Sequence, residues 1–163
     1  MIVLGVDPSL TMTAVAAYDT EAQTFLDVTA FPATGETMAE RLYFLAYSLD
    51  DFSHQVGVVG NRAVFGIEES HVNPKQGIQS ALKQRETIGA LSALAGERGW
   101  KEVRVAPTQV KKAMTGHGGA SKAQMVAMAM KHLDISDYPM TKRKDIADAM
   151  GVCLAATHRI ITG

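Results

Sequence analysis

Apolar residues form short continuous runs near the N-terminus of the chain. Residues 2–7, 11–18 and 25–31 are rich in valine, alanine, threonine and phenylalanine, and turn-forming residues separate them. Short apolar runs between such breakers are typical of buried β-strands. The pattern therefore predicts three strands that follow one another as an antiparallel meander.

Helical spacing of apolar residues begins after this meander. Residues 36–55 and 77–98 repeat apolar positions every three to four residues, with Thr37 suited to an N-cap and Gly99 to a C-terminal stop. The remaining expected elements are strands at 64–68 and 103–106, helices at 107–114, 121–132 and 145–160, and a polar loop at 134–144. This order predicts an α/β fold: one domain over residues 1–163, with a five-stranded mixed sheet and helices on both faces.

Composition places the chain among ordinary globular proteins. Its 163 residues are 47% hydrophobic and 20% charged, which suits one domain with a real core. Cys153 is the only cysteine, so an internal disulfide is excluded and a reducing compartment is expected. No apolar run is long enough to span a bilayer, and the start at Met1 lacks the charged leader of a signal peptide. We therefore expect a cytoplasmic protein without a membrane partner.

Charge is unevenly distributed although the net charge is only −1. Residues 1–60 hold eight acids and one base, whereas residues 101–144 hold nine bases and three acids. Such asymmetry predicts a basic face suited to nucleic acid. The alternative is that these lysines are simply solvated. Lys142-Arg143-Lys144 is the densest basic run, and we expect it to contact a DNA backbone.

Four acids stand where a carboxylate is costly or buried. Asp7 and Glu68 each end an apolar strand, and Asp145 and Asp148 lie three residues apart on an alanine-rich helix, so these two share a face. Converging carboxylates repel one another unless cations hold them together. The set predicts a divalent-metal site with oxygen ligands.

Two of these acids, Asp7 and Asp145, also have a structural interpretation. Asp7 is suited to capping a turn, or to opening the phosphate-binding hairpin of an actin-like ATPase. Asp145 is suited to the first turn of a helix, where the macrodipole favours it. Glu69 follows Glu68 directly and so points to the other side of the strand, where we expect it to be solvated.

Taken together, the motifs resemble the RuvC family of Holliday-junction resolvases, within the ribonuclease H-like superfamily. The resemblance covers nearly the whole chain. It rests on Leu4-Gly5-Val6-Asp7-Pro8, Ile67-Glu68, Gln109-Val110-Lys111 through Gly116, Ser121-Lys122-Ala123-Gln124 and Asp145-Ile146-Ala147-Asp148-Ala149.

The resemblance implies a structure-selective endonuclease that cuts four-way DNA junctions and leaves 5′-phosphate and 3′-hydroxyl ends. Two Mg²⁺ ions per site are expected, with Mn²⁺ able to replace them. The implied metal ligands are Asp7, Glu68, Asp145 and Asp148, with Lys122 as a further catalytic residue. The expected DNA contacts are Lys111, Lys112, Lys122, His71, Lys142, Arg143 and Lys144.

Two positions depart from the family pattern. Ser9 stands where the family usually has glycine, and His71 stands near the place of an aromatic residue that wedges into the junction. Imidazole stacks on a base less extensively than phenyl, so a broader branched-DNA nuclease of phage type, acting on flaps and forks, is an alternative. The structural interpretation of His71 is an exposed loop histidine.

Three further hypotheses concern partners and competing functions. Symmetric cutting of a four-way junction requires two sites, so a homodimer is expected, with helix 77–98 as its interface unless that helix packs within the monomer.

The glycine loop 116–119 lacks the Walker pattern, so no nucleotide cofactor is expected. An actin-like kinase would need a second domain, and a non-catalytic junction-binding module would not need the four acids.

Overall fold

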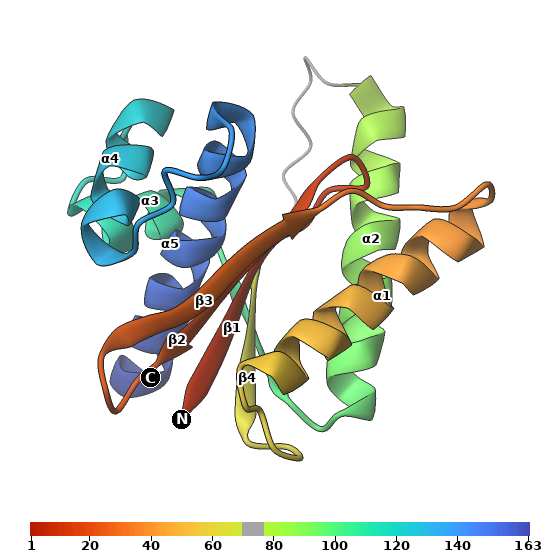
Figure 1. Ribbon diagram of the computed structural model, residues 1–163, viewed down its shortest axis with the longest axis horizontal. Coiled ribbons are helices and arrows are strands. Elements are labelled where there is room, and N and C mark those ends of the chain that lie inside the picture. The colour runs from red at the N-terminus through yellow and green to blue at the C-terminus, as the bar shows by residue number, and fades with distance from the viewer. Residues whose placement is uncertain (70–76) are drawn as a thin grey trace.

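The computed structural model describes residues 1–69 and 77–163, which form one five-stranded sheet covered by helices on both faces (Figure 1). The strand order is β3-β2-β1-β4-β5. The first three strands pair antiparallel, and β1–β4 and β4–β5 pair parallel, which confirms the predicted mixed sheet. The strands are β1 (Ile2–Asp7), β2 (Thr13–Asp19), β3 (Thr24–Phe31), β4 (Ala63–Glu68) and β5 (Lys101–Val105).

Two groups of helices sandwich the sheet. Two of them, α1 and α2, cover one face, while α5 crosses the other with α3 and α4 beside it (Figure 1). Within residues 1–69 and 77–163, no helix combines the length and apolar character needed to cross a membrane. The helices are α1 (Met38–Gln55), α2 (Gly77–Glu97), α3 (Pro107–Thr115), α4 (Lys122–His132) and α5 (Met140–Thr162).

The central strands are buried on both faces, as their continuous apolar runs predict. Leu4 and Phe65 belong to the core beneath α1 and α2. Val3 and Val64, one residue earlier in each strand, belong to the core beneath α5. Successive side chains of a strand point to opposite faces, so residues 3, 5 and 7 of β1 and 64, 66 and 68 of β4 all face α5.

Two glycines allow α5 to lie directly against these strands. A Cβ added to Gly5 would collide with the carbonyl oxygen of Ala149 and stand 2.6 Å from the backbone nitrogen of Cys153. A Cβ on Gly66 would stand 2.9 Å from the Cβ of Ala156. The Cys153 thiol also donates to the carbonyl oxygen of Ala16 at 3.2 Å. The helix therefore packs against the sheet at a distance that side chains at residues 5 and 66 would prevent.

Most predicted boundaries are confirmed to within two residues, but the start of α5 is not. The polar segment 134–144 was expected to be a loop, whereas α5 begins at Met140, five residues before the expected Asp145. The first turn of α5 is largely solvent-exposed. It therefore has no repeat of apolar residues from which a helix could be predicted. Asp145 consequently lies in the second turn, which weakens the interpretation that it serves the helix dipole.

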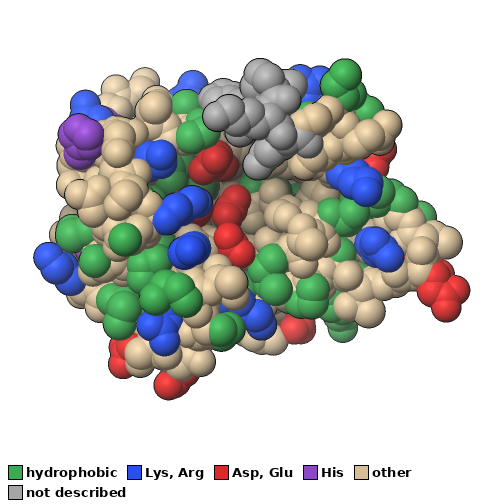
Figure 2. Space-filling view, turned by 90° about the horizontal axis from the view of Figure 1, so that it is seen from above, with side chains coloured by type: hydrophobic (Ala, Val, Ile, Leu, Met, Phe, Trp, Pro, Cys, Tyr) green, Lys and Arg blue, Asp and Glu red, His purple; other side chains and the backbone are tan. Residues whose placement is uncertain are grey.

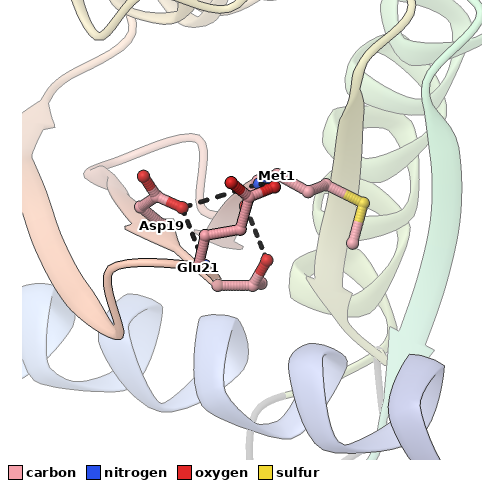
Figure 3. Close-up of polar contacts among 4 residues, drawn as sticks. Met1, Asp19 and Glu21 are labelled. Carbon is pink, nitrogen blue, oxygen red and sulfur yellow. Dashed lines mark hydrogen bonds and ion pairs between the residues drawn. The ribbon is translucent and has the colours of Figure 1, made fainter.

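The opposite end of the sheet is fixed by the chain terminus. The Met1 ammonium group donates to Glu21 Oε1 at 3.1 Å and lies 3.5 Å from Asp19 Oδ1. Figure 3 shows both carboxylates beside Met1, that of Asp19 from the end of β2 and that of Glu21 from the turn that follows. The exposed ion pairs hold the start of β1 against the β2–β3 turn.

The outer edge of β3 is also closed by side chains. The Asp27 carboxylate accepts a hydrogen bond from the Val28 backbone N–H at 2.7 Å. The Tyr138 hydroxyl donates to the Val28 carbonyl oxygen at 2.9 Å. Both polar groups of Val28 that face away from β2 are thus satisfied within the chain.

We predict that Gly5→Ala lowers the free energy of unfolding by about 1–3 kcal/mol, the usual cost of overpacking a tight core. Gly96→Ala on α2 is the matched control, because a Cβ there meets no atom of the described residues within 4 Å. That substitution should be neutral or stabilising by up to about 1 kcal/mol. Urea denaturation of both variants measures the difference. A Gly5→Ala protein as stable as the parent would contradict the close approach of α5.

Candidate active site

The packing of α5 brings its acids level with the ends of the strands. Ala149 of α5 faces Gly5 of β1. Asp145 lies four residues before Ala149, about 6 Å along the helix. Asp7 lies two residues after Gly5, about 6.6 Å along the strand. Helix and strand run in opposite directions (Figure 1), so both acids lie beyond this contact towards the same end of the sheet, where the charge of Asp145 raises the pKa of Asp7.

The same register relates the second pair of acids. Val152 of α5 faces Gly66 of β4, with its Cγ1 3.2 Å from the place of a Cβ. Asp148 precedes Val152 by four residues, and Glu68 follows Gly66 by two. Asp148 and Glu68 therefore both lie beyond this contact, towards the same end of the sheet. The parallel neighbours β1 and β4 end side by side, so the two pairs of acids are adjacent.

Electrostatic effects show that these groups share one environment. The pKa of Asp7 is raised to about 7. Burial of the carboxyl group is the largest cause, and the negative charges of Glu68 and Asp145 raise the pKa further. The positive charge of Lys122 acts in the opposite direction. The pKa of Asp145 is also raised by burial, against the lowering effect of Lys122 and Lys144. The sequence-predicted acids thus interact across β1, β4 and α5.

Lys122 neutralises the most buried acid of the group. Its ammonium donates to Asp148 Oδ2 in an ion pair, and the Asp148 side chain is only 8% exposed. Lys122 is the first residue of α4, directly after the N-cap Ser121. The Ser121 hydroxyl accepts from the Gln124 N–H and the Gln124 side chain accepts from the Ser121 N–H, a reciprocal capping box. The predicted cap therefore fixes where Lys122 emerges.

The face where β1 and β4 end is hollowed in the middle (Figure 2). Figure 2 shows acidic side chains gathered in the middle of this face, with Lys and Arg side chains beside them. In the described residues, no group of three or more acidic, histidine or cysteine side chains has the spacing of a metal site. The donor set nevertheless fits a divalent cation, because all four groups are carboxylates and their mutual repulsion is what a cation would relieve.

The turn after Asp7 is held by hydroxyl groups. The Thr13 hydroxyl donates to the Ser9 carbonyl oxygen at 2.7 Å and accepts from the Ser9 N–H at 3.2 Å. The hydroxyls of Ser9 and Thr11 lie 3.1 Å apart. This network fixes the chain as it leaves the carboxylate of Asp7. The alternating Ser9, Thr11 and Thr13 are the sequence signal that could have predicted it.

The other predicted site residues lie around the acids in different ways. Lys111 is partly buried on α3, Lys112 is exposed there, and Lys144 is exposed in the first turns of α5, next to partly buried Lys142. None of these four lysines forms an ion pair with a described acid. His71 falls within residues 70–76, outside the described residues.

Arg143 differs from its neighbours because its guanidinium binds protein atoms. Nε donates to the Tyr138 carbonyl oxygen at 2.6 Å, and the terminal NH₂ group donates to the Ser136 carbonyl oxygen. The binding of backbone carbonyl oxygens by Arg143 could not be predicted from the sequence, since no periodicity or motif marks such a side chain.

Glu69 faces away from the acids, as predicted. It lines a cavity of about 390 Å³ with Arg85 and Arg104, on the α2 side of the sheet. The acidic hollow is instead an open surface feature, which suits an extended substrate better than a small molecule.

Comparison with known proteins gives a consistent family match. The profile of the family described as crossover junction endodeoxyribonuclease RuvC matches residues 3–158. A protein of that name from Paenarthrobacter aurescens is 30% identical over 167 residues, covering 99% of this chain and 83% of the relative. Another, from Chlorobium phaeovibrioides, is 43% identical over 77 residues, covering 47% of this chain and 40% of the relative.

Solved structures match the fold. The structure of Thermus thermophilus RuvC in complex with a Holliday junction substrate superposes with a TM-score of 0.79 and 21% identity, covering 100% of this chain and 96% of that one. The predicted ribonuclease H-like architecture is thereby confirmed.

Without metal, Asp7 should make stability depend on pH. Its pKa is about 7 in the folded protein against an ordinary value of 3.8, so the folded state binds the proton more tightly than the unfolded chain does. The associated stability is full below about pH 4 and is lost as the pH rises towards 7. Asp7→Asn should remove this dependence, which amounts to at most about 4 kcal/mol.

Chemical denaturation of both proteins in EDTA from pH 4 to pH 8 measures this effect. The stability of Asp7→Asn relative to the parent should increase with pH and level off above pH 7. A difference that is the same at every pH would show that the Asp7 carboxyl is not held in the folded protein as described.

Proposed function

Because the chain belongs to the RuvC family of crossover junction endodeoxyribonucleases, we propose that it is an endonuclease that cuts four-way DNA junctions. The observation that carries this proposal is the close packing of α5 on β1 and β4, which brings Asp145 and Glu68 near enough to Asp7 for their charges to raise its pKa. Residues 1–163 act in this proposal as one nuclease domain.

The proposed cofactor is a pair of Mg²⁺ ions, with Mn²⁺ able to replace them. The carboxylates of Asp7, Glu68, Asp145 and Asp148 would hold them. When bound, such ions activate water and stabilise the leaving 3′ oxygen of a phosphodiester. Oxygen ligands of this kind suit hard divalent cations. The products would be 5′-phosphate and 3′-hydroxyl ends.

Lys122 has two roles in this proposal. In the metal-free protein its ammonium neutralises Asp148. A cation held by Asp148 would replace that counter-charge. The Lys122 side chain, which is 54% exposed, would then be free to turn to the scissile phosphate and offset the charge that develops there.

Basic residues beside the hollow would bind the DNA backbone. Lys142 and Lys144 lie on the first turns of α5, and Lys111 and Lys112 lie on α3. Their contribution would be salt-dependent and independent of sequence. The predicted contact by His71 stays a prediction.

A broader branched-DNA activity remains the second candidate. It is favoured by His71, because an imidazole offers less stacking surface than a larger aromatic ring for opening a junction. Under both candidates we expect no nucleotide cofactor and a cytoplasmic location.

We further propose a homodimer built on α2. Ile78 and Leu82 of this helix are 73% and 47% exposed. A Cβ added to Gly89 would meet no described atom within 4 Å. Exposed apolar residues beside small ones support burial against a second copy. A twofold dimer would present two sites to opposed strands of a junction.

Asp7→Asn and Glu68→Gln should each reduce Mg²⁺-dependent cleavage of a labelled four-way junction at least about 100-fold, since a lost metal ligand removes several kcal/mol of transition-state stabilisation. Junction binding in EDTA should be retained. Glu69→Gln is the matched control: it is the adjacent acid on the opposite face, and it should cut like the parent.

Flap, fork and linear duplex substrates in the same assay separate the two candidate functions. Equal cutting of flaps and junctions would favour the broader activity. Full cleavage by Asp7→Asn would contradict the proposed mechanism.

The dimer predicts a mass of twice 17.5 kDa by light scattering coupled to size exclusion. Leu82→Asp should halve this mass, because a charge would be buried at the interface. Tyr43→Asp on α1 is the control: Tyr43 is 73% exposed but lies on another helix. A monomeric parent protein, with junction present, would overturn the dimer.

A further inference from the structure

The helix that carries two of the four acids begins without a side-chain cap. Pro139 precedes the first turn of α5 and makes no capping hydrogen bond. In contrast, α1 and α4 both begin with a capping box, at Thr37 and Ser121. The first N–H groups of a helix have no partner within it, so an uncapped start frays readily. Fraying here would reach Asp145, which is only five residues from Met140.

Arg143 binds the segment that leads into this helix. Its Nε and terminal NH₂ groups donate to the carbonyl oxygens of Tyr138 and Ser136, and its backbone N–H donates to the Pro139 carbonyl oxygen at 3.0 Å. Its charge also lowers the pKa of Asp134, after the larger effect of hydrogen bonds from Ser136. The guanidinium fork is suited to holding two acceptors at once.

The segment that leads into α5 also contacts the sheet. The Tyr138 hydroxyl donates to the Val28 carbonyl oxygen of β3 at 2.9 Å. Ile135 is fully buried in the core beneath α5. A chain of contacts therefore runs from the edge of the sheet through Tyr138 to Arg143. It ends on the turn of α5 that precedes Asp145.

We propose that Arg143 is a positioning residue that holds Asp145 in place for metal binding, and that it does not contact DNA. The inference rests on the proposed nuclease function. The part of α5 from Ala149 onwards is held independently of Arg143, because it packs against Gly5 and Gly66. Loss of the Arg143 contacts would thus loosen the first two turns while the fold persists. Lys142 and Lys144 retain the role of DNA contacts.

Mn²⁺ binding by calorimetry, without DNA, tests this directly. Arg143→Ala should weaken Mn²⁺ affinity about 10–100-fold, the usual effect of losing a residue that supports a metal ligand. Its junction affinity in EDTA and the salt dependence of that affinity should equal those of the parent. Lys142→Ala should show the reverse: unchanged Mn²⁺ affinity, weaker junction binding and a shallower salt slope.

Arg143→Lys separates position from charge. Lysine keeps the positive charge but has no planar fork, so it should not restore Mn²⁺ affinity. Restoration by lysine, or a shallower salt slope in Arg143→Ala, would overturn the inference and assign Arg143 to DNA. Unchanged Mn²⁺ affinity in Arg143→Ala would overturn it too.

Two controls keep the outcomes distinct. Tyr138→Phe removes one hydroxyl and should weaken Mn²⁺ affinity in the same direction by a smaller factor, which tests the chain of contacts if Arg143→Ala does not fold. Equal Mn²⁺ affinity in Tyr138→Phe and the parent would count against that chain. Absence of Mn²⁺ binding by the parent protein would refute the proposed function itself.

Discussion

The close approach of α5 to β1 and β4 is the constraint on which the site depends. Glycine at residues 5 and 66 lets the helix backbone lie against the strands. Four helical residues and two strand residues span nearly the same length. The acids of α5 therefore lie at the same end of the sheet as the acids that end β1 and β4. A bulkier residue at position 5 would separate the carboxylates even though every one of them was still present.

Gathering these carboxylates has an electrostatic cost that the protein offsets locally. The raised pKa of Asp7 reflects burial and its acidic neighbours, and the ion pair of Lys122 with Asp148 supplies the opposite charge. A bound cation would relieve the same repulsion. Metal binding and folding stability are therefore linked, because any ligand that binds only the folded state stabilises it.

Much of the fold follows from local patterns in the sequence, and less of the site does. Apolar runs located the five strands, and Thr37 and Ser121 marked helix starts, because these signals act over a few residues. Asp7 and Glu68 were identified because each interrupts an apolar run. The start of α5 was misplaced because Arg143 and Tyr138 stabilise it through contacts with backbone carbonyls, one of them in β3. Such contacts depend on tertiary structure and leave no periodic trace.

The closed edge of β3 has a consequence for behaviour at high concentration. An open edge strand is a template on which another chain can add a strand, the first step towards fibrils. Asp27 and Tyr138 occupy both outward polar groups of Val28, so an incoming strand would have to break these bonds and approach a carboxylate. At the other edge, β5 presents the charged Lys101, Glu102 and Arg104. These contacts and charges therefore disfavour the joining of two molecules sheet to sheet.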